Sequence, residues 1–150
     1  MVNNKVHNKN IKKDNIFQVH GYNNCFPLLK KNQYEIIRID VLDQKKDFFA
    51  STVDFQKYYH CLRMLNKNDF YNKHEGIRSQ GIVVQFKGPI VREIGNYKAV
   101  NSNSCVLILD NIKDPQNVGQ IIRTAECAGI NGIVFPSHNS FRVSNTIINV

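Results

Sequence analysis

An amide and a guanidinium six residues apart, Asn117 and Arg123, are the side chains whose types and spacing best suit chemistry. A guanidinium can bind a phosphate through two parallel hydrogen bonds, and an amide can both donate to and accept from a ligand. Both residues follow Cys105–Leu109, an apolar run that predicts a strand buried on both faces of a parallel sheet. Because α/β folds build their sites at the carboxyl ends of such strands, we expect both residues to face one crevice there.

The segment that must position these two side chains has clear start and stop signals. The Asp114-Pro115 turn leads into a helix predicted over Asn117–Ala128. Gly119 permits close approach of a backbone or a ligand, and Gly129 suits the left-handed C-terminal cap. A further strand over Gly132–Phe135 and the start of a helix at Asn145–Val150 complete a βαβ pattern, which predicts an α/β fold.

Upstream of residue 89 the pattern is less regular. Two β-rich runs predict strands, and two stretches predict helices, one with Pro27 in its first turn and one with helical apolar spacing. These elements are strands over Tyr34–Val41 and Gly81–Phe86, and helices over Asn24–Lys31 and Asp54–Leu65. We therefore divide the chain into a basic tail (1–15), a small α/β domain (16–88), a linker (89–103) and a second α/β domain (104–150).

The positive charge lies in the first part of the chain. Residues 99–150 hold three basic and three acidic side chains, so the formal net charge of +8 comes from 17 basic and 9 acidic residues in 1–98. This asymmetry favours nucleic acid as a partner. A soluble surface with Asn/Lys-rich composition explains the charge equally well.

The four cysteines are widely spaced, which argues against disulfides and a zinc site. Cys105 and Cys127 are expected to face the core. No apolar run is long enough to span a bilayer, and the N-terminus has no secretory signal. We therefore expect a cytoplasmic protein, with an organelle as the second choice.

The predicted helix and its flanks hold the run D-P-Q-N-V-G-Q-I-I-R-T-A-E-C-A-G. It resembles the first motif of the SpoU family of RNA ribose 2′-O-methyltransferases, in the SPOUT (α/β-knot) superfamily. Because eight constrained positions occur in a strand–loop–helix–strand context, this signal is specific. The matching residues are Asp114, Pro115, Asn117, Gly119, Arg123, Thr124, Ala125 and Gly129, with Glu126 at a position that is often acidic in the family.

A weaker resemblance lies upstream. The Gly21-Tyr22-Asn23 turn and Tyr34–Val41 look like the start of the family's small substrate-binding domain, which is similar to the ribosomal-protein L30e fold. The segment Ser79-Gln80-Gly81-Ile82-Val83 looks like the H-Q-G-[IV]-V sequence near that domain's end, with Ser79 where histidine is usual. No anchor to the family occurs between Gln44 and Asn72.

The resemblance implies methyl transfer from S-adenosylmethionine to a ribose 2′-hydroxyl of RNA, with 23S-type rRNA favoured over tRNA. A 2′-hydroxyl is a poor nucleophile, so it must be positioned and its developing charge stabilised. In the family the arginine of the motif, here Arg123, is assigned this part. Asn117 is assigned the ordering of the loop and the substrate ribose. No metal is implied.

The resemblance also implies a cofactor site that this sequence does not complete. Two further family motifs build the S-adenosylmethionine pocket and the knot, and we expect the cofactor residues beyond Val150, with the knot incomplete. The chain is thus interpreted as a fragment, a truncated gene model or a degenerate copy. A homodimer is implied for the complete protein.

The alternative from another class is a non-catalytic L30e-like RNA-binding module with a vestigial methyltransferase half. An unrelated Rossmann-type enzyme ranks below both, because no phosphate-loop glycine pattern occurs. Tyr58 and Tyr59 could stack on unpaired bases, with core packing expected for at least one of them. Candidate phosphate contacts, which could equally be a solvated basic face, are Lys12, Lys13, Lys30, Lys31 and Arg78.

Overall fold

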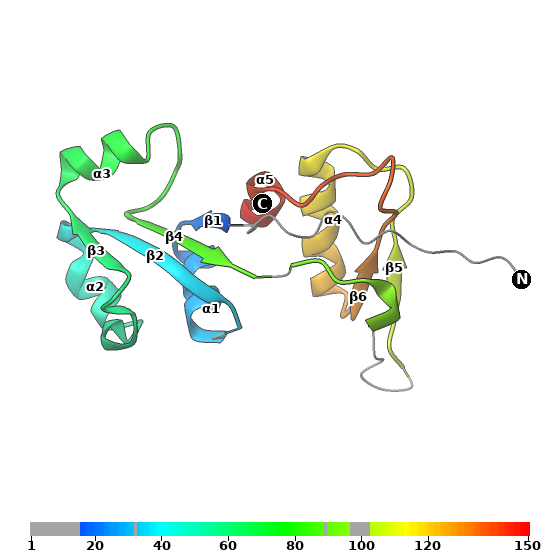
Figure 1. Cartoon of the computed structure of the whole chain (residues 1–150), viewed down its shortest axis with the longest axis horizontal. Helices are drawn as coiled ribbons and strands as arrows, with labels where there is room; N and C mark the ends of the chain where they lie inside the picture. Colours follow the sequence, from blue (N-terminus) through cyan, green and yellow to red (C-terminus); the bar gives the residue numbers. More distant parts are fainter. Residues whose placement is uncertain (1–15, 32, 89, 97–102) are drawn as a thin grey trace, which may run out of the picture.

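Two sheets of unequal size organise the chain (Figure 1). The computed structural model describes residues 16–31, 33–88, 90–96 and 103–150. The predicted basic tail, with Lys12 and Lys13, lies outside the described residues. No helix within the described ranges is long and apolar enough to cross a membrane.

The larger sheet has four strands in the order β1-β4-β2-β3. β2 and β3 are parallel, whereas β4 is antiparallel to both β1 and β2. The predicted strands Tyr34–Val41 and Gly81–Phe86 are confirmed as β2 and β4, each displaced by one residue. The four strands are β1 (Ile16–His20), β2 (Glu35–Leu42), β3 (Leu62–Leu65) and β4 (Ile82–Lys87).

Helices cover both faces of this sheet, as Figure 1 shows. On β2, Ile39 and Val41 pack in the cluster that includes Cys25 and Leu29 of α1 and Phe49 of α2. The alternate residue Leu42 packs instead with Phe70 of α3, because successive side chains of a strand point to opposite faces. The elements that follow the strands are α1 (Tyr22–Lys31), the 3₁₀ turn η1 (Asp43–Lys45), α2 (Lys46–Ala50), the 3₁₀ turn η2 (Phe55–Tyr58) and α3 (Lys67–Lys73).

The second part of the chain is a βαβ unit, as its regular pattern predicts. The parallel strands β5 (Val106–Ile108) and β6 (Gly132–Val134) flank α4 (Pro115–Cys127). Val118 of α4 and Leu109 beside β5 are buried in a separate apolar cluster. Along the sequence, the 3₁₀ turn η3 (Ile94–Asn96) lies between β4 and β5. The last helix is α5 (Asn145–Asn149), which confirms the predicted start of a helix there.

Helix α5 joins the two parts by docking on the free edge of β1 (Figure 1). Asn145 Oδ1 accepts the Gln18 amide at 2.9 Å, and Asn149 Oδ1 accepts the His20 amide at 3.0 Å. Asn149 Nδ2 also donates to the Gln18 carbonyl at 2.7 Å. Two asparagine side chains therefore satisfy backbone groups that an edge strand otherwise exposes.

The helix predicted over Asp54–Leu65 is wrong. The structure has the short turn η2 there, followed by strand β3 alongside β2. Asp54 caps η2 by accepting the Gln56 amide at 3.0 Å, and the chain then turns into the strand. The spacing of the apolar residues in this segment is compatible both with a helix and with a turn followed by a strand. Pairing of β3 with β2 favours the strand.

Two smaller expectations also fail. Pro27 lies inside α1 rather than in its first turn, because the helix begins at Tyr22. The carbonyl of Asn23, which loses its helical donor there, belongs to an exposed residue and can bind water.

The expected burial of Cys105 and Cys127 is likewise not observed. Both are exposed, whereas Cys25 and Cys61 are buried. Cys105 precedes β5 rather than lying within it, and Cys127 ends α4 on a solvent-facing side.

Candidate active site

Asp114 fixes the point at which α4 begins. Its carboxylate accepts the backbone amides of Gln116 at 3.3 Å and Asn117 at 3.1 Å, and Pro115 occupies the first turn. These interactions satisfy helix amides that have no intrahelical partner. Asn117 is therefore held in the first turn of α4, just after the carboxyl end of β5.

Gly129 ends the same helix in a left-handed conformation, with φ of +74°. The Gly129 amide donates to the Glu126 carbonyl at 3.0 Å, and the Ile130 amide donates to the Ala125 carbonyl at 2.9 Å. This pair of bonds is the Schellman arrangement, in which glycine is preferred. The predicted role of Gly129 is confirmed.

Gly119 allows close approach, as predicted, and the group that approaches is a side chain of the protein. A Cβ added at Gly119 would lie 2.6 Å from the Cβ of Val150. Helix α5 therefore packs directly on α4 at this position. This contact gives the glycine a packing role that needs no ligand.

A shallow hollow of about 660 Å³ lies beside α4 and β5. Its polar wall comes from Asn117, Gln120 and Thr124, and the Thr124 hydroxyl donates to the Gln120 carbonyl at 3.0 Å. Its remaining wall is apolar, and none of the lining residues is charged. The apolar lining is Leu107, Ile112, Ile121, Ala125, Ala128 and Ile130.

Arg123 does not line this hollow. Six residues of α-helix place it about 120° around the axis and about 9 Å along it from Asn117. Its side chain is exposed, and no hydrogen bond or ion pair joins it to another described residue. The guanidinium is thus free to bind an anion, but it does not share a crevice with Asn117.

Glu126 is also exposed on α4, and its side chain forms no hydrogen bond or ion pair with another described residue. Of the candidate phosphate contacts, Lys30 and Lys31 form the exposed last turn of α1. The exposed Arg78 instead lies near the start of α1, since its carbonyl is 3.9 Å from a Cβ built at Gly21. These cations therefore do not form one patch.

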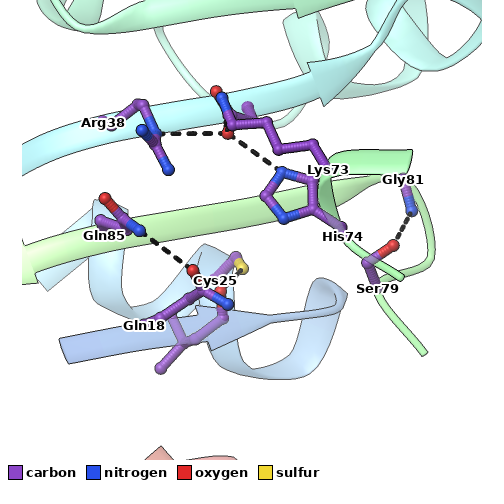
Figure 2. Close-up of polar contacts among 10 residues, drawn as sticks. Gln18, Cys25, Arg38, Lys73, His74, Ser79, Gly81 and Gln85 are labelled. Atoms are coloured by element: carbon purple, nitrogen blue, oxygen red, sulfur yellow. Dashed lines mark hydrogen bonds and ion pairs between the residues drawn. The ribbon is translucent and has the colours of Figure 1, made fainter. Parts of the chain in front are cut away.

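A buried charged cluster in the first part of the chain escaped the sequence analysis. Asp40 of β2 is 1% exposed, and its Oδ2 lies 3.2 Å from Arg38 Nε, 3.0 Å from Lys73 Nζ and 3.0 Å from His74 Nε2. Figure 2 shows Arg38, Lys73 and His74 converging from β2 and the end of α3. The cluster ties α3 to the sheet. Its sequence signal was Asp40, an acidic residue between the apolar Ile39 and Val41 in the buried half of β2.

Burial lowers the pKa of His74 below its ordinary value of 6.5, and this effect outweighs the opposing influence of Asp40. The neutral ring can donate its Nε2 hydrogen to the carboxylate. Arg38 and Lys73, which are partly exposed, provide charges that offset Asp40. In the described part of the chain, no group of three or more His, Cys, Asp or Glu side chains could hold a metal ion.

The chain is similar to known RNA methyltransferases. Residues 104–150 match the SpoU rRNA Methylase family. The 23S rRNA (guanosine-2′-O-)-methyltransferase RlmB of Shewanella oneidensis is 27% identical over 144 residues, which are 93% of this chain and 57% of that protein. A putative TrmH family tRNA/rRNA methyltransferase of Staphylococcus saprophyticus is 39% identical over 54 residues, or 36% of this chain and 22% of that protein.

Solved structures show the same fold. An AdoMet-bound rRNA methyltransferase from Sinorhizobium meliloti superposes with a TM-score of 0.64 at 18% identity, over 89% of this chain and 48% of that one. The SpoU methyltransferase AviRb of Streptomyces viridochromogenes, in complex with AdoMet, gives a TM-score of 0.61 at 16% identity, over 89% and 49%. The chain thus has the mixed α/β fold of these enzymes and spans about half their length.

Proposed function

From the match of residues 104–150 to the SpoU rRNA Methylase family, we propose that the whole protein is an RNA ribose 2′-O-methyltransferase that uses S-adenosylmethionine. The observation that carries the proposal is the family match over residues 104–150. That segment holds the Asp114–Gly129 motif on a helix capped at both ends. Arg123 projects from this helix with no partner among the described residues.

The substrate we propose is large-subunit rRNA. A relative that aligns with 93% of this chain is named for 23S rRNA guanosine 2′-O-methylation. We further propose that residues 16–88 form an L30e-like substrate-binding domain, that 89–103 are a linker and that 104–150 belong to the catalytic domain. The four-stranded sheet with helices on both faces supports the first of these assignments.

Arg123 is the residue we propose to act on the reacting ribose. Its free guanidinium can bind the phosphate next to that ribose and favour the alkoxide that develops on the 2′-oxygen. Asn117, held by the Asp114 cap, would order the loop after β5 and contact the ribose. Because the two side chains lie on different sides of α4, Arg123 would contact the phosphate and the 2′-oxygen, whereas Asn117 would contact the sugar ring.

We propose that the described residues supply only part of the S-adenosylmethionine site. S-adenosylmethionine carries a carboxylate and positive charges, yet the hollow beside α4 has apolar and uncharged polar walls. Its residues therefore do not fit the amino-acid end of the cofactor. We propose that other segments of the whole protein supply those contacts.

We also propose that the whole protein works as a cytoplasmic homodimer, as its family resemblance implies. Size-exclusion chromatography with light scattering of the full-length gene product would test the dimer. A monomer at micromolar concentration would contradict it.

The experiment that tests the activity is methylation of undermethylated rRNA by the full-length gene product with S-adenosylmethionine. Nuclease digestion and mass spectrometry should reveal a new 2′-O-methylnucleoside. RNA binding without methyl transfer would contradict the proposal and favour a non-catalytic RNA-binding module. Absence of both RNA binding and methyl transfer would contradict both functions.

A further inference from the structure

Tyr58 and Tyr59 are neighbours in sequence, but they occupy opposite environments. Tyr58 is 5% exposed and Tyr59 is 83% exposed. The Tyr58 hydroxyl donates to the Leu29 carbonyl at 2.7 Å, which satisfies a carbonyl in the last turn of α1. The buried tyrosine therefore fixes η2 against the end of α1 and leaves the next ring in solvent.

The same hydrogen bond brings cations from two elements to one place. Lys30 and Lys31 lie in the last turn of α1, and Lys57 of η2 has its Nζ 5.5 Å from the Tyr58 ring centroid. All three lysines are exposed, and none forms an ion pair with another described residue. The nearby Asp54 carboxylate accepts a backbone amide within its own turn.

We propose that Lys30, Lys31, Lys57 and Tyr59, with the exposed His60, form a binding surface for unpaired RNA. This proposal rests on the proposed function, and it assigns the place where the first part of the chain holds its substrate. An exposed aromatic ring can stack on any unpaired base, and adjacent lysines can bind the flanking phosphates. Base-paired RNA would bind less well, because its bases are already stacked.

The composition of this surface favours RNA over a protein partner. Lysine is depleted in protein interfaces, whereas unpaired cations beside an exposed aromatic ring are typical of single-strand binding. Arg78 is not part of the surface, since it lies near the opposite end of α1. Of the candidate cations that the structure describes, only Lys30 and Lys31 at the end of α1 therefore belong to this surface.

The test is fluorescence anisotropy of the full-length gene product with a labelled single-stranded RNA of about 12 nucleotides. Tyr59→Ala should weaken binding about fivefold or more, whereas Tyr59→Phe should keep the affinity because stacking needs only the ring. The matched control is Tyr71→Ala on α3, which removes another exposed tyrosine and should leave the affinity unchanged. Equal affinities of Tyr59→Ala and wild type would overturn the proposal.

Salt dependence tests the lysines separately. Replacing Lys30 and Lys31 with Gln together should reduce the slope of log affinity against log salt by about 1.4, as two lost phosphate contacts predict. The control pair is Lys45→Gln with Lys46→Gln, which lies beyond the other end of β2 and should not change the slope. An unchanged slope in the first pair, or equal affinity for a fully paired hairpin, would overturn the proposed surface.

Methyl transfer by the same preparations separates this proposal from the proposed function. If the wild-type protein methylates rRNA but Tyr59→Ala binds RNA with wild-type affinity, the proposed binding surface is contradicted and the proposed activity is supported. If Tyr59→Ala weakens RNA binding but the wild-type protein transfers no methyl group, the proposed binding surface is supported and the proposed activity is contradicted.

Discussion

Gly119 of α4 lies directly against Val150, so that a Cβ added at Gly119 would be 2.6 Å from the valine Cβ. Real Cβ atoms do not approach other atoms so closely, and the valine Cβ cannot rotate away as a long side chain would. The glycine therefore sets how closely α5 packs on α4. Since α5 also binds β1, this contact helps hold the two parts of the chain together.

Gly119→Ala should lower the free energy of unfolding. Alanine favours the helix by about 1 kcal/mol, but overpacking against Val150 should cost about 1–3 kcal/mol. Chemical denaturation of the full-length gene product measures the net change. Gly95→Ala is the control, because no atom lies within 4 Å of a Cβ built there. Stabilisation by Gly119→Ala would show that the contact with Val150 is absent.

Asn149→Ala should loosen the free edge of β1. The substitution removes the acceptor of the His20 amide and the donor to the Gln18 carbonyl. Hydrogen exchange by NMR should show the His20 amide exchanging about fivefold faster, as the loss of one hydrogen bond of about 1 kcal/mol predicts. The exposed Asn68→Ala is the matched control, and unchanged exchange at His20 in Asn149→Ala would refute the docking of α5.

His74 should make stability depend on pH. Because burial lowers its pKa in the folded protein below 6.5, the unfolded chain takes up a proton first as the pH falls. The contribution of the neutral His74 ring to the free energy of unfolding is therefore complete above about pH 6.5. It is lost as the pH falls toward the pKa of His74 in the folded protein. The groups facing the ring are Asp40, Lys73 and Arg38.

Denaturation midpoints of wild type and His74→Gln between about pH 7.5 and 5.5 measure this effect. Gln has an amide donor for Asp40 but does not titrate, so its midpoint should fall less than that of wild type. An equal decrease of the denaturation midpoint in the two proteins would show that His74 does not cause the pH dependence of stability.

The elements predicted correctly have local causes. An apolar run is sufficient for the strand β5, although its expected burial on both faces is wrong, since Ile108 is 72% exposed. Asp114 and Gly129 mark the ends of α4 through bonds to residues close in sequence. The motif residues were therefore placed in the right element from the sequence alone.

The features missed depend on contacts between distant residues. Asp40 and His74 are 34 residues apart, and Asn149 binds Gln18 across 131 residues. The strand β3 likewise forms because β2 lies beside it, whereas its own apolar spacing suits a helix equally well. The partners of Asp40, the docking of α5 and the placement of Tyr59 at the end of α1 could be found only from the three-dimensional structure.

The most direct test of the proposed activity is the rate of methyl transfer from S-adenosylmethionine to rRNA by the full-length gene product and its Arg123→Ala variant. Arg142→Ala is the matched control, since Arg142 is also exposed and has no partner among the described residues. We expect Arg123→Ala to reduce turnover about 100-fold or more while RNA affinity stays close to that of wild type. We expect Arg142→Ala to retain the wild-type rate. Full turnover in Arg123→Ala would contradict its assigned role, and no methyl transfer by wild type would contradict the proposed function itself.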